Sequence, residues 1–182
     1  MASAFSHALV ALALGKVSHH PVMDLRALGL GVLCAGLPDI DVIGFAYGIQ
    51  YGHLWGHRGL THSLAFAVLL SAGLVAVCYR RESGAVRAGM GLYLFLCAAS
   101  HGILDALTDG GLGVAFFSPF DTTRYFFPVR PVAVSPIGIR EFFNEQGLYV
   151  LASELTWIWL PAAALFVALR ALKVVSLRIN AR

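Results

Sequence analysis

The chain has 182 residues and a net charge of +3, and 58% of its residues are hydrophobic while 13% are charged. Charged residues are about half as frequent as the roughly 25% usual in soluble domains, so the apolar excess predicts a protein that contacts a lipid bilayer. The charge is small and forms no dense basic stripe, which excludes nucleic acid as a partner. The length fits a single domain, residues 1–182.

Five apolar segments follow one another along the chain: residues 4–17, 25–47, 63–79, 88–108 and 148–172. A helix needs roughly 20 mostly apolar residues to cross a bilayer. The first segment is short, and the second is interrupted by Pro38, Asp39 and Asp41. We therefore expect a helix over 25–37, with Pro38 ending it or beginning a new turn. The pattern predicts an all-α integral membrane bundle of about five segments.

Basic residues gather beside the first link, in the third link and after the last segment: Lys16, Arg26, Arg80, Arg81, Arg87, Arg170, Lys173, Arg178 and Arg182. Placing all of them in the cytoplasm predicts an outside N-terminus and an inside C-terminus. His19 and His20, beside Lys16, are then solvated loop residues. Residues 110–147 oppose this orientation, because they carry three arginines on the outer side: Arg124, Arg130 and Arg140.

Residues 110–147 contain many aromatic rings and four prolines, Pro119, Pro128, Pro131 and Pro136. We expect an interfacial loop, because aromatic rings favour the membrane surface. Its role is either plain interfacial packing or a lid over a site. Its three arginines either receive an anionic substrate or contact phospholipid.

Alternating segment directions place eight polar residues, in or just before the apolar segments, at the same membrane face: His7, Asp39, Asp41, His57, His62, His101, Asp105 and Glu154. Ionisable residues in membrane segments are costly and usually mark function. The topology therefore predicts one polar site, at the non-cytoplasmic face in the orientation above.

His101 and Asp105 stand four residues apart and share a helical face. Imidazole and carboxylate are ligands for Zn²⁺ or Mn²⁺, although a hydrogen-bonded pair closing a helix end would look the same. Asp39 and Asp41 serve either as ligand and base or as helix N-caps. His7 is a ligand or an interfacial residue, and Glu154 is a ligand, an acid/base group or an ion-pair partner.

The stretch of residues 57–63 offers His57 and His62 as further ligands. Two residues five apart do not lie on the same helical face, so part of the stretch should be a turn, which Gly59 permits. Arg58 binds a phosphate bidentately or anchors to lipid headgroups, and Thr61 is a candidate N-cap. Outside this stretch, His53 is read as an interfacial residue, and Cys34, Cys78 and Cys97 as small apolar residues.

His7, Pro38-Asp39-Ile40-Asp41, the stretch from His57 to Ser63, and His101-Gly-Ile-Leu-Asp105 together resemble the bacterial inner-membrane metal-dependent hydrolases. That family is in turn similar to zinc-dependent phospholipase C and the P1-type nucleases. The resemblance covers residues 4–109 and implies inner-membrane location. It also implies a metal site in which His101 and Asp105 are ligands, joined by Asp39 or Asp41, by His57 or His62, and by His7.

The chain departs from those soluble enzymes because no second His-rich set follows Asp105. Glu154 is the available substitute, so we expect one or two divalent ions, with Zn²⁺ first and Mn²⁺ possible. The predicted activity is hydrolysis of a phosphoester in a lipid or other amphiphile, with Asp41 (or Asp39) as base and Arg58 stabilising negative charge. The alternative is a non-enzymatic membrane protein with a structural or transported metal. The sequence leaves oligomeric partners open.

Overall fold

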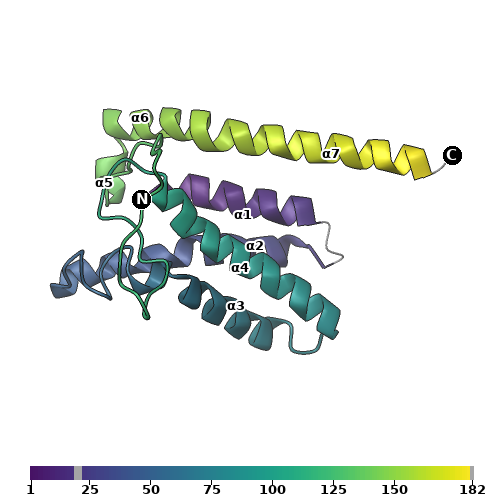
Figure 1. Cartoon of the computed structure of the whole chain (residues 1–182), viewed down its shortest axis with the longest axis horizontal. Coiled ribbons are helices and arrows are strands. Elements are labelled where there is room, and N and C mark those ends of the chain that lie inside the picture. Colours follow the sequence, from purple (N-terminus) through teal and green to yellow (C-terminus); the bar gives the residue numbers. More distant parts are fainter. Residues whose placement is uncertain (19–21, 181–182) are drawn as a thin grey trace.

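The computed structural model describes residues 1–18 and 22–180, so His19 and His20 lie outside the described part of the chain. That part is helical, as predicted (Figure 1). The elements in chain order are α1 (Ala4–Ser18), α2 (Leu25–Gly36), η1 (Leu37–Tyr47), η2 (Leu60–His62), α3 (Leu64–Cys78), α4 (Gly84–Ala106), α5 (Ile139–Phe142), α6 (Glu145–Glu154), η3 (Leu155–Trp159) and α7 (Leu160–Asn180). Of these, η1 and η2 are 3₁₀ helices and η3 is a π-helical turn.

Three helical stretches are long and apolar enough to cross a bilayer: Leu25–Tyr47, Gly84–Ala106 and Glu145–Leu172. The other two predicted segments form α1 and α3, which are apolar but only 15 residues each. At 1.5 Å per residue these helices are roughly 22 Å long, less than the ~30 Å hydrocarbon layer. These two helices are therefore shorter than the hydrocarbon layer, unlike the three longer stretches.

Helices α1 to α4 pack closely because small residues face one another at their contacts, as is common in membrane bundles. The phenolic hydroxyl of Tyr93 donates to the carbonyl of Ala11 at 3.2 Å. A Cβ on Gly31 would lie 2.0 Å from that hydroxyl oxygen, so only glycine allows this approach. Cys34 and Cys97 lie fully buried in the same core and carry free thiols.

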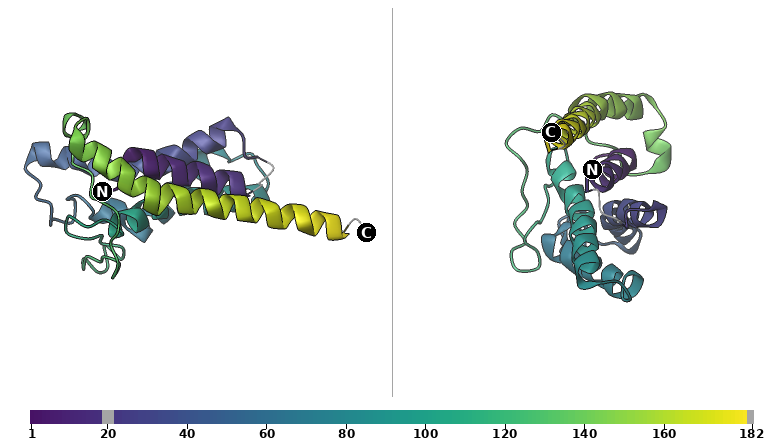
Figure 2. Two further views of the ribbon diagram at one scale, coloured as in Figure 1. Left: turned by 90° about the horizontal axis from the view of Figure 1, so that it is seen from above. Right: turned by 90° about the vertical axis from the view of Figure 1, so that its right-hand side faces the viewer.

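Helices α6 and α7 form one long rod with the π-turn between them, and this rod lies on the outside of the bundle against α1 (Figure 2). Most of its large apolar side chains are exposed, among them Leu148, Leu160 and Leu165. In a bilayer these side chains face lipid.

Local capping explains where the helices begin. Asp24 and Ser83 accept from the backbone amides of Ala27 and Val86 at the starts of α2 and α4. At α3 the cap is Ser63, which accepts from Phe66 N at 3.1 Å, and not Thr61 as the sequence suggested. The α-helical part of the second segment ends at Gly36, and Pro38 stands in the first turn of η1, as expected.

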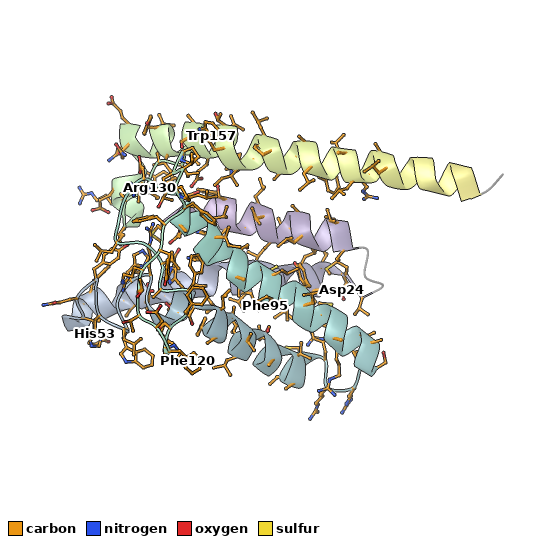
Figure 3. All side chains as sticks on the ribbon, in the orientation of Figure 1. Asp24, His53, Phe95, Phe120, Arg130 and Trp157 are labelled. Carbon is orange, nitrogen blue, oxygen red and sulfur yellow. The ribbon has the colours of Figure 1, made fainter. Side chains whose placement is uncertain are left out.

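The long loop after α4 folds back over one end of the bundle (Figure 1). It is held there by backbone hydrogen bonds, from Phe127 N to Ala106 O at 3.0 Å and from Leu64 N to Phe116 O at 2.9 Å. In Figure 3, His53, Phe120 and Arg130 lie toward this end and Asp24 toward the other. Five elements meet at this loop-covered end: the first turns of α1 and α3, the last turn of α4, and the helices η1 and α6.

Candidate metal centre

Helix α4 carries the first two donors, because His101 and Asp105 lie one turn apart on its buried face. Both side chains are fully buried. The ring nitrogen Nδ1 of His101 donates to the carbonyl of Ala35 at 2.6 Å, in the last turn of α2. A hydrogen on Nδ1 leaves the lone pair of Nε2 free and fixes the ring plane.

Helix η1 separates the functions of its two carboxylates. A 3₁₀ helix has three residues per turn, so Asp39 and Asp41 point in different directions. Asp39 Oδ1 lies 3.3 Å from His101 Nε2. Asp41 is directed instead toward the loop that follows η1, where it accepts from the His57 ring nitrogen Nδ1 at 2.8 Å.

That loop brings His62 to the centre. It turns tightly at Gly59, where a Cβ would lie 2.2 Å from the carbonyl oxygen of Leu54. His62 Nε2 then faces Asp39 Oδ1 at 3.6 Å and Asp105 Oδ2 at 3.6 Å. The loop is therefore not a linker but the element that supplies the second imidazole.

Four donor atoms from three parts of the chain thus gather at one point, those of Asp39, His62, His101 and Asp105. The measured separations are 3.0 Å between the two imidazole nitrogens, 3.3 and 3.6 Å from Asp39, and 3.6 and 3.9 Å from Asp105. Four donors at ~2.0–2.2 Å from one zinc ion in a tetrahedron stand about 3.3–3.6 Å apart. Three of the five separations fall in this range and the other two lie about 0.3 Å outside it, so these donors could hold a divalent metal ion.

Asp41 orients His57 and His62 through their Nδ1 atoms. Its second oxygen, Oδ2, lies 3.1 Å from His62 Nδ1 and accepts from the Thr61 hydroxyl at 2.7 Å and from Arg58 N at 3.2 Å. A carboxylate behind a histidine fixes the tautomer and strengthens the imidazole as a ligand. Asp41, predicted as base and ligand, holds these two imidazoles, and with His57 and His62 it forms a second group of residues that could hold a metal ion.

The two loop histidines differ in charge. Burial lowers the pKa of His57 despite the raising effect of Asp41, so this ring is neutral. Burial also opposes the charged form of His62, but hydrogen bonds with Asp105, Asp39 and Asp41 outweigh it and raise its pKa to about 10. The negative field of three carboxylates therefore favours a positive charge at the position of His62.

The guanidinium of Arg58 is fully buried and bound inside the protein. It donates to Asp105 Oδ2 at 3.1 Å, to the Gly110 carbonyl at 2.8 Å and to the Thr108 hydroxyl at 2.9 Å. Its backbone φ is 62°, in the left-handed region that costs a non-glycine residue about 1 kcal/mol or more. Arg58 reaches the centre as predicted, but there it supports Asp105.

His7 and Glu154 occupy different positions at the same end. His7 stacks on His101 with ring centroids 3.8 Å apart, and its Nε2 lies 3.6 Å from Asp105 Oδ1. Both ring nitrogens of His7 are buried without a hydrogen-bond partner. Glu154 is fully buried beyond the four-donor group, where the backbone amide and hydroxyl of Ser3 and the hydroxyl of Ser6 donate to it.

Arg124 is a structural residue whose partners the sequence did not reveal. Its guanidinium donates to the carbonyls of His57 at 2.9 Å, Tyr51 at 3.0 Å and His53 at 3.2 Å. It thereby ties the long loop to the loop that carries the histidines. Only its position in an aromatic loop marked it in the sequence. Of the other two loop arginines, Arg130 lies over the ring of Phe126.

The comparisons with known proteins agree with a membrane bundle. Residues 1–178 match the family described as YdjM inner membrane protein. The chain is 37% identical over 166 residues to the inner membrane protein YbcI of Escherichia coli (strain K12), which covers 91% of this chain and 95% of that protein. No solved structure matches the chain. The chain belongs to the YdjM family of inner membrane proteins.

Proposed function

We propose that this protein is a membrane-embedded, metal-dependent hydrolase that acts on a phosphoester bond of an amphiphilic substrate. The observation that carries the proposal is the four-donor group of Asp39, His62, His101 and Asp105, whose donor atoms all lie within 4.8 Å of one another. Zinc is the first choice, because it takes imidazole and carboxylate donors in tetrahedral sites, and manganese is the second.

The residues around the centre support a catalytic role for the metal in addition to a structural one. Natural structures leave few buried polar atoms unpaired, and such atoms call for an explanation. Here both nitrogens of His7 and the Nε2 of His57 are buried without a hydrogen-bond partner. Arg58 also holds a left-handed backbone. Strained backbone conformations and other energetically unfavourable features are concentrated at functional sites.

Access to the centre is through Asp39, whose side chain is 17% exposed, whereas the side chains of the other three donors are fully buried. A position of this end near the boundary between headgroups and acyl chains is part of the proposal, and the length of α1 and α3, less than the hydrocarbon thickness, supports it. A phosphoester lipid suits both the access through Asp39 and this depth, because its charged group lies at the boundary between headgroups and acyl chains. The resemblance to zinc-dependent phospholipase C points to the same substrate class.

A bound divalent ion would lower the pKa of a coordinated water and polarise the phosphoester. The proton lost by the water would pass to His57, whose neutral ring lies 5.3 Å from that of His62 between centroids, and then to the leaving alkoxide as its bond to phosphorus breaks. Asp41 orients His57 by accepting from Nδ1, so the carboxylate predicted as base acts through the imidazole. Arg58 holds Asp105 in place by its hydrogen bond.

The test is chelator-sensitive release of phosphate or headgroup from a panel of phospholipids and isoprenoid phosphates by the purified protein. We expect release that stops with chelator and returns with Zn²⁺. Asp39→Asn should weaken metal binding and release together, while Asp121→Asn, an exposed control, should change neither. Metal-loaded protein with no chelator-sensitive release from any member of the panel would refute the hydrolase proposal.

A structural metal is the second candidate, and one observation favours it. The four protein donors already complete a tetrahedron, whereas catalytic zinc usually keeps one position for water. This candidate expects a metal that raises the melting temperature and supports no turnover. Transport is disfavoured, because the donors lie at one end of the bundle and not near its middle.

A further inference from the structure

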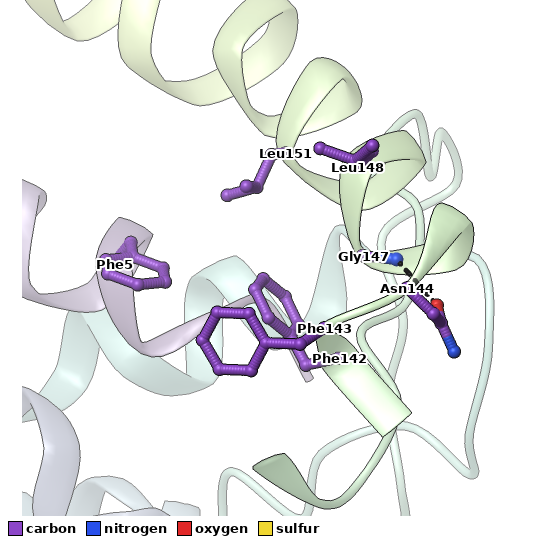
Figure 4. Close-up of a pocket in the computed structure, with 7 residues that line it drawn as sticks. All are labelled: Phe5, Phe142, Phe143, Asn144, Gly147, Leu148 and Leu151. Carbon is purple, nitrogen blue, oxygen red and sulfur yellow. Dashed lines mark hydrogen bonds between the residues drawn. The ribbon is translucent and has the colours of Figure 1, made fainter. Parts of the chain in front are cut away.

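Two apolar hollows lie beside the metal centre and share three aromatic rings, those of Phe5, Phe142 and Phe143. The inner hollow has a volume of about 480 Å³ and includes Ala2 and Val42 in its lining. The outer hollow has a volume of about 380 Å³ and runs along α6 past Leu148 and Leu151 (Figure 4). Because they share a wall of rings, we treat the two hollows as one groove.

Two lining residues of the inner hollow, Ala2 and Val42, connect it to the metal centre. The backbone amide of Ala2 donates to Asp105 Oδ1 at 2.8 Å. Val42 follows Asp39 by three residues in η1, and side chains three apart in a 3₁₀ helix eclipse each other. The accessible donor of the centre therefore lies on the same face of η1 as the groove lining.

The outer end of the groove opens toward lipid. Phe143 is 76% exposed and Leu148 is 70% exposed on the outward-facing rod of α6. An occupant of the whole groove therefore extends from beside a cluster of carboxylates and imidazoles to an exposed apolar surface. An amphiphile with one polar group and one long apolar chain has this character.

The lining of both hollows is mostly apolar, so an occupant that makes few hydrogen bonds suits them. A hydrocarbon chain is thin and flexible, and pockets of about 300–1,000 Å³ are usual for small ligands.

We propose that this groove binds the hydrocarbon chain of the substrate, so that the protein selects single long-chain phosphoesters by chain length. The inference rests on the proposed function for the identity of the polar group. Removing several methylenes leaves part of the groove unfilled and should weaken binding severalfold, whereas exchanging the group beyond the phosphate should matter less.

The experiment is photo-crosslinking of purified, metal-loaded protein with hexadecyl phosphate that carries a diazirine within its chain. We expect crosslinks in residues 1–5 and 142–151, removed by unlabelled hexadecyl phosphate and not by butyl phosphate. Ala4→Trp fills the inner hollow from the first turn of α1 and should weaken labelling about tenfold. Ala164→Trp, on the exposed side of α7, should leave it unchanged.

Zinc affinity is measured on the same samples, so that a failure of the groove proposal can be told from a failure of the metal proposal. Tight zinc binding with labels spread along α7 and no effect of Ala4→Trp would overturn the groove and leave the metal proposal standing. Chain-length-dependent labelling of the groove in a protein that binds no zinc would support the groove and overturn the metal proposal. An equal effect of both tryptophan variants would also count against the groove.

Discussion

Replacing Asp41 by Asn should weaken metal binding although Asp41 is not among the four donors. The carboxylate holds His57, His62, Thr61 and Arg58 N at 2.7–3.2 Å. An asparagine can keep its oxygen toward three of these groups, but its NH₂ group then faces His57 Nδ1. That nitrogen must accept instead of donate, and His62 loses a charged partner. Removing such a carboxylate typically costs 10–100-fold in metal affinity, about 1.4–2.8 kcal/mol.

The assay is competition for zinc between the purified protein and a chromophoric chelator. Asp121→Asn is the matched control, because Asp121 is an exposed loop residue that accepts from Thr123 N. Circular dichroism and the melting temperature of the metal-free forms check that both variants fold. Wild-type zinc affinity in the folded Asp41→Asn protein would show that Asp41 does not orient the ligands, and the reasoning would be wrong.

Three further predictions follow from the loops. A pKa of about 10 keeps His62 protonated below that pH, so zinc binding must release the proton. Zinc affinity should therefore rise about tenfold per pH unit from pH 7 to 9. A flat pH profile without proton release would contradict this prediction. Arg124→Met removes the hydrogen bonds to the histidine loop and should lower the free energy of unfolding by about 2 kcal/mol, with Arg124→Lys restoring part of it in chemical unfolding. Ser83→Cys in a Cys78→Ala background should react with an impermeant maleimide only after the membrane is opened, and labelling of intact cells would reverse the predicted orientation.

The sequence was sufficient to predict the helices and the end at which the polar residues meet. Apolar length marked five segments, and alternating directions then required one common face for His101, Asp105 and the Asp39 turn. The i, i+4 spacing of His101 and Asp105 also follows from helix geometry alone. These features depend on local periodicity, which a single sequence contains.

The roles inside the centre depended on tertiary contacts that periodicity does not contain. Asp39 and Asp41 looked equivalent in the sequence, but a 3₁₀ continuation directs one to the donors and the other to the histidine loop. The partners of Arg58 and Arg124 lie about 50 to 70 residues away in the chain. The cap of α3 is Ser63 because Thr61 bonds to Asp41.

X-ray absorption spectroscopy of the purified protein, with metal content measured on the same sample, tests the central claim most directly. The account predicts at least one tightly bound divalent ion per chain. Its shell should contain two imidazole nitrogens and carboxylate oxygens at ~2.0–2.2 Å, and one imidazole should disappear in His101→Gln. Protein without stoichiometric metal, or with a shell that lacks imidazole and is unchanged by that substitution, would contradict it.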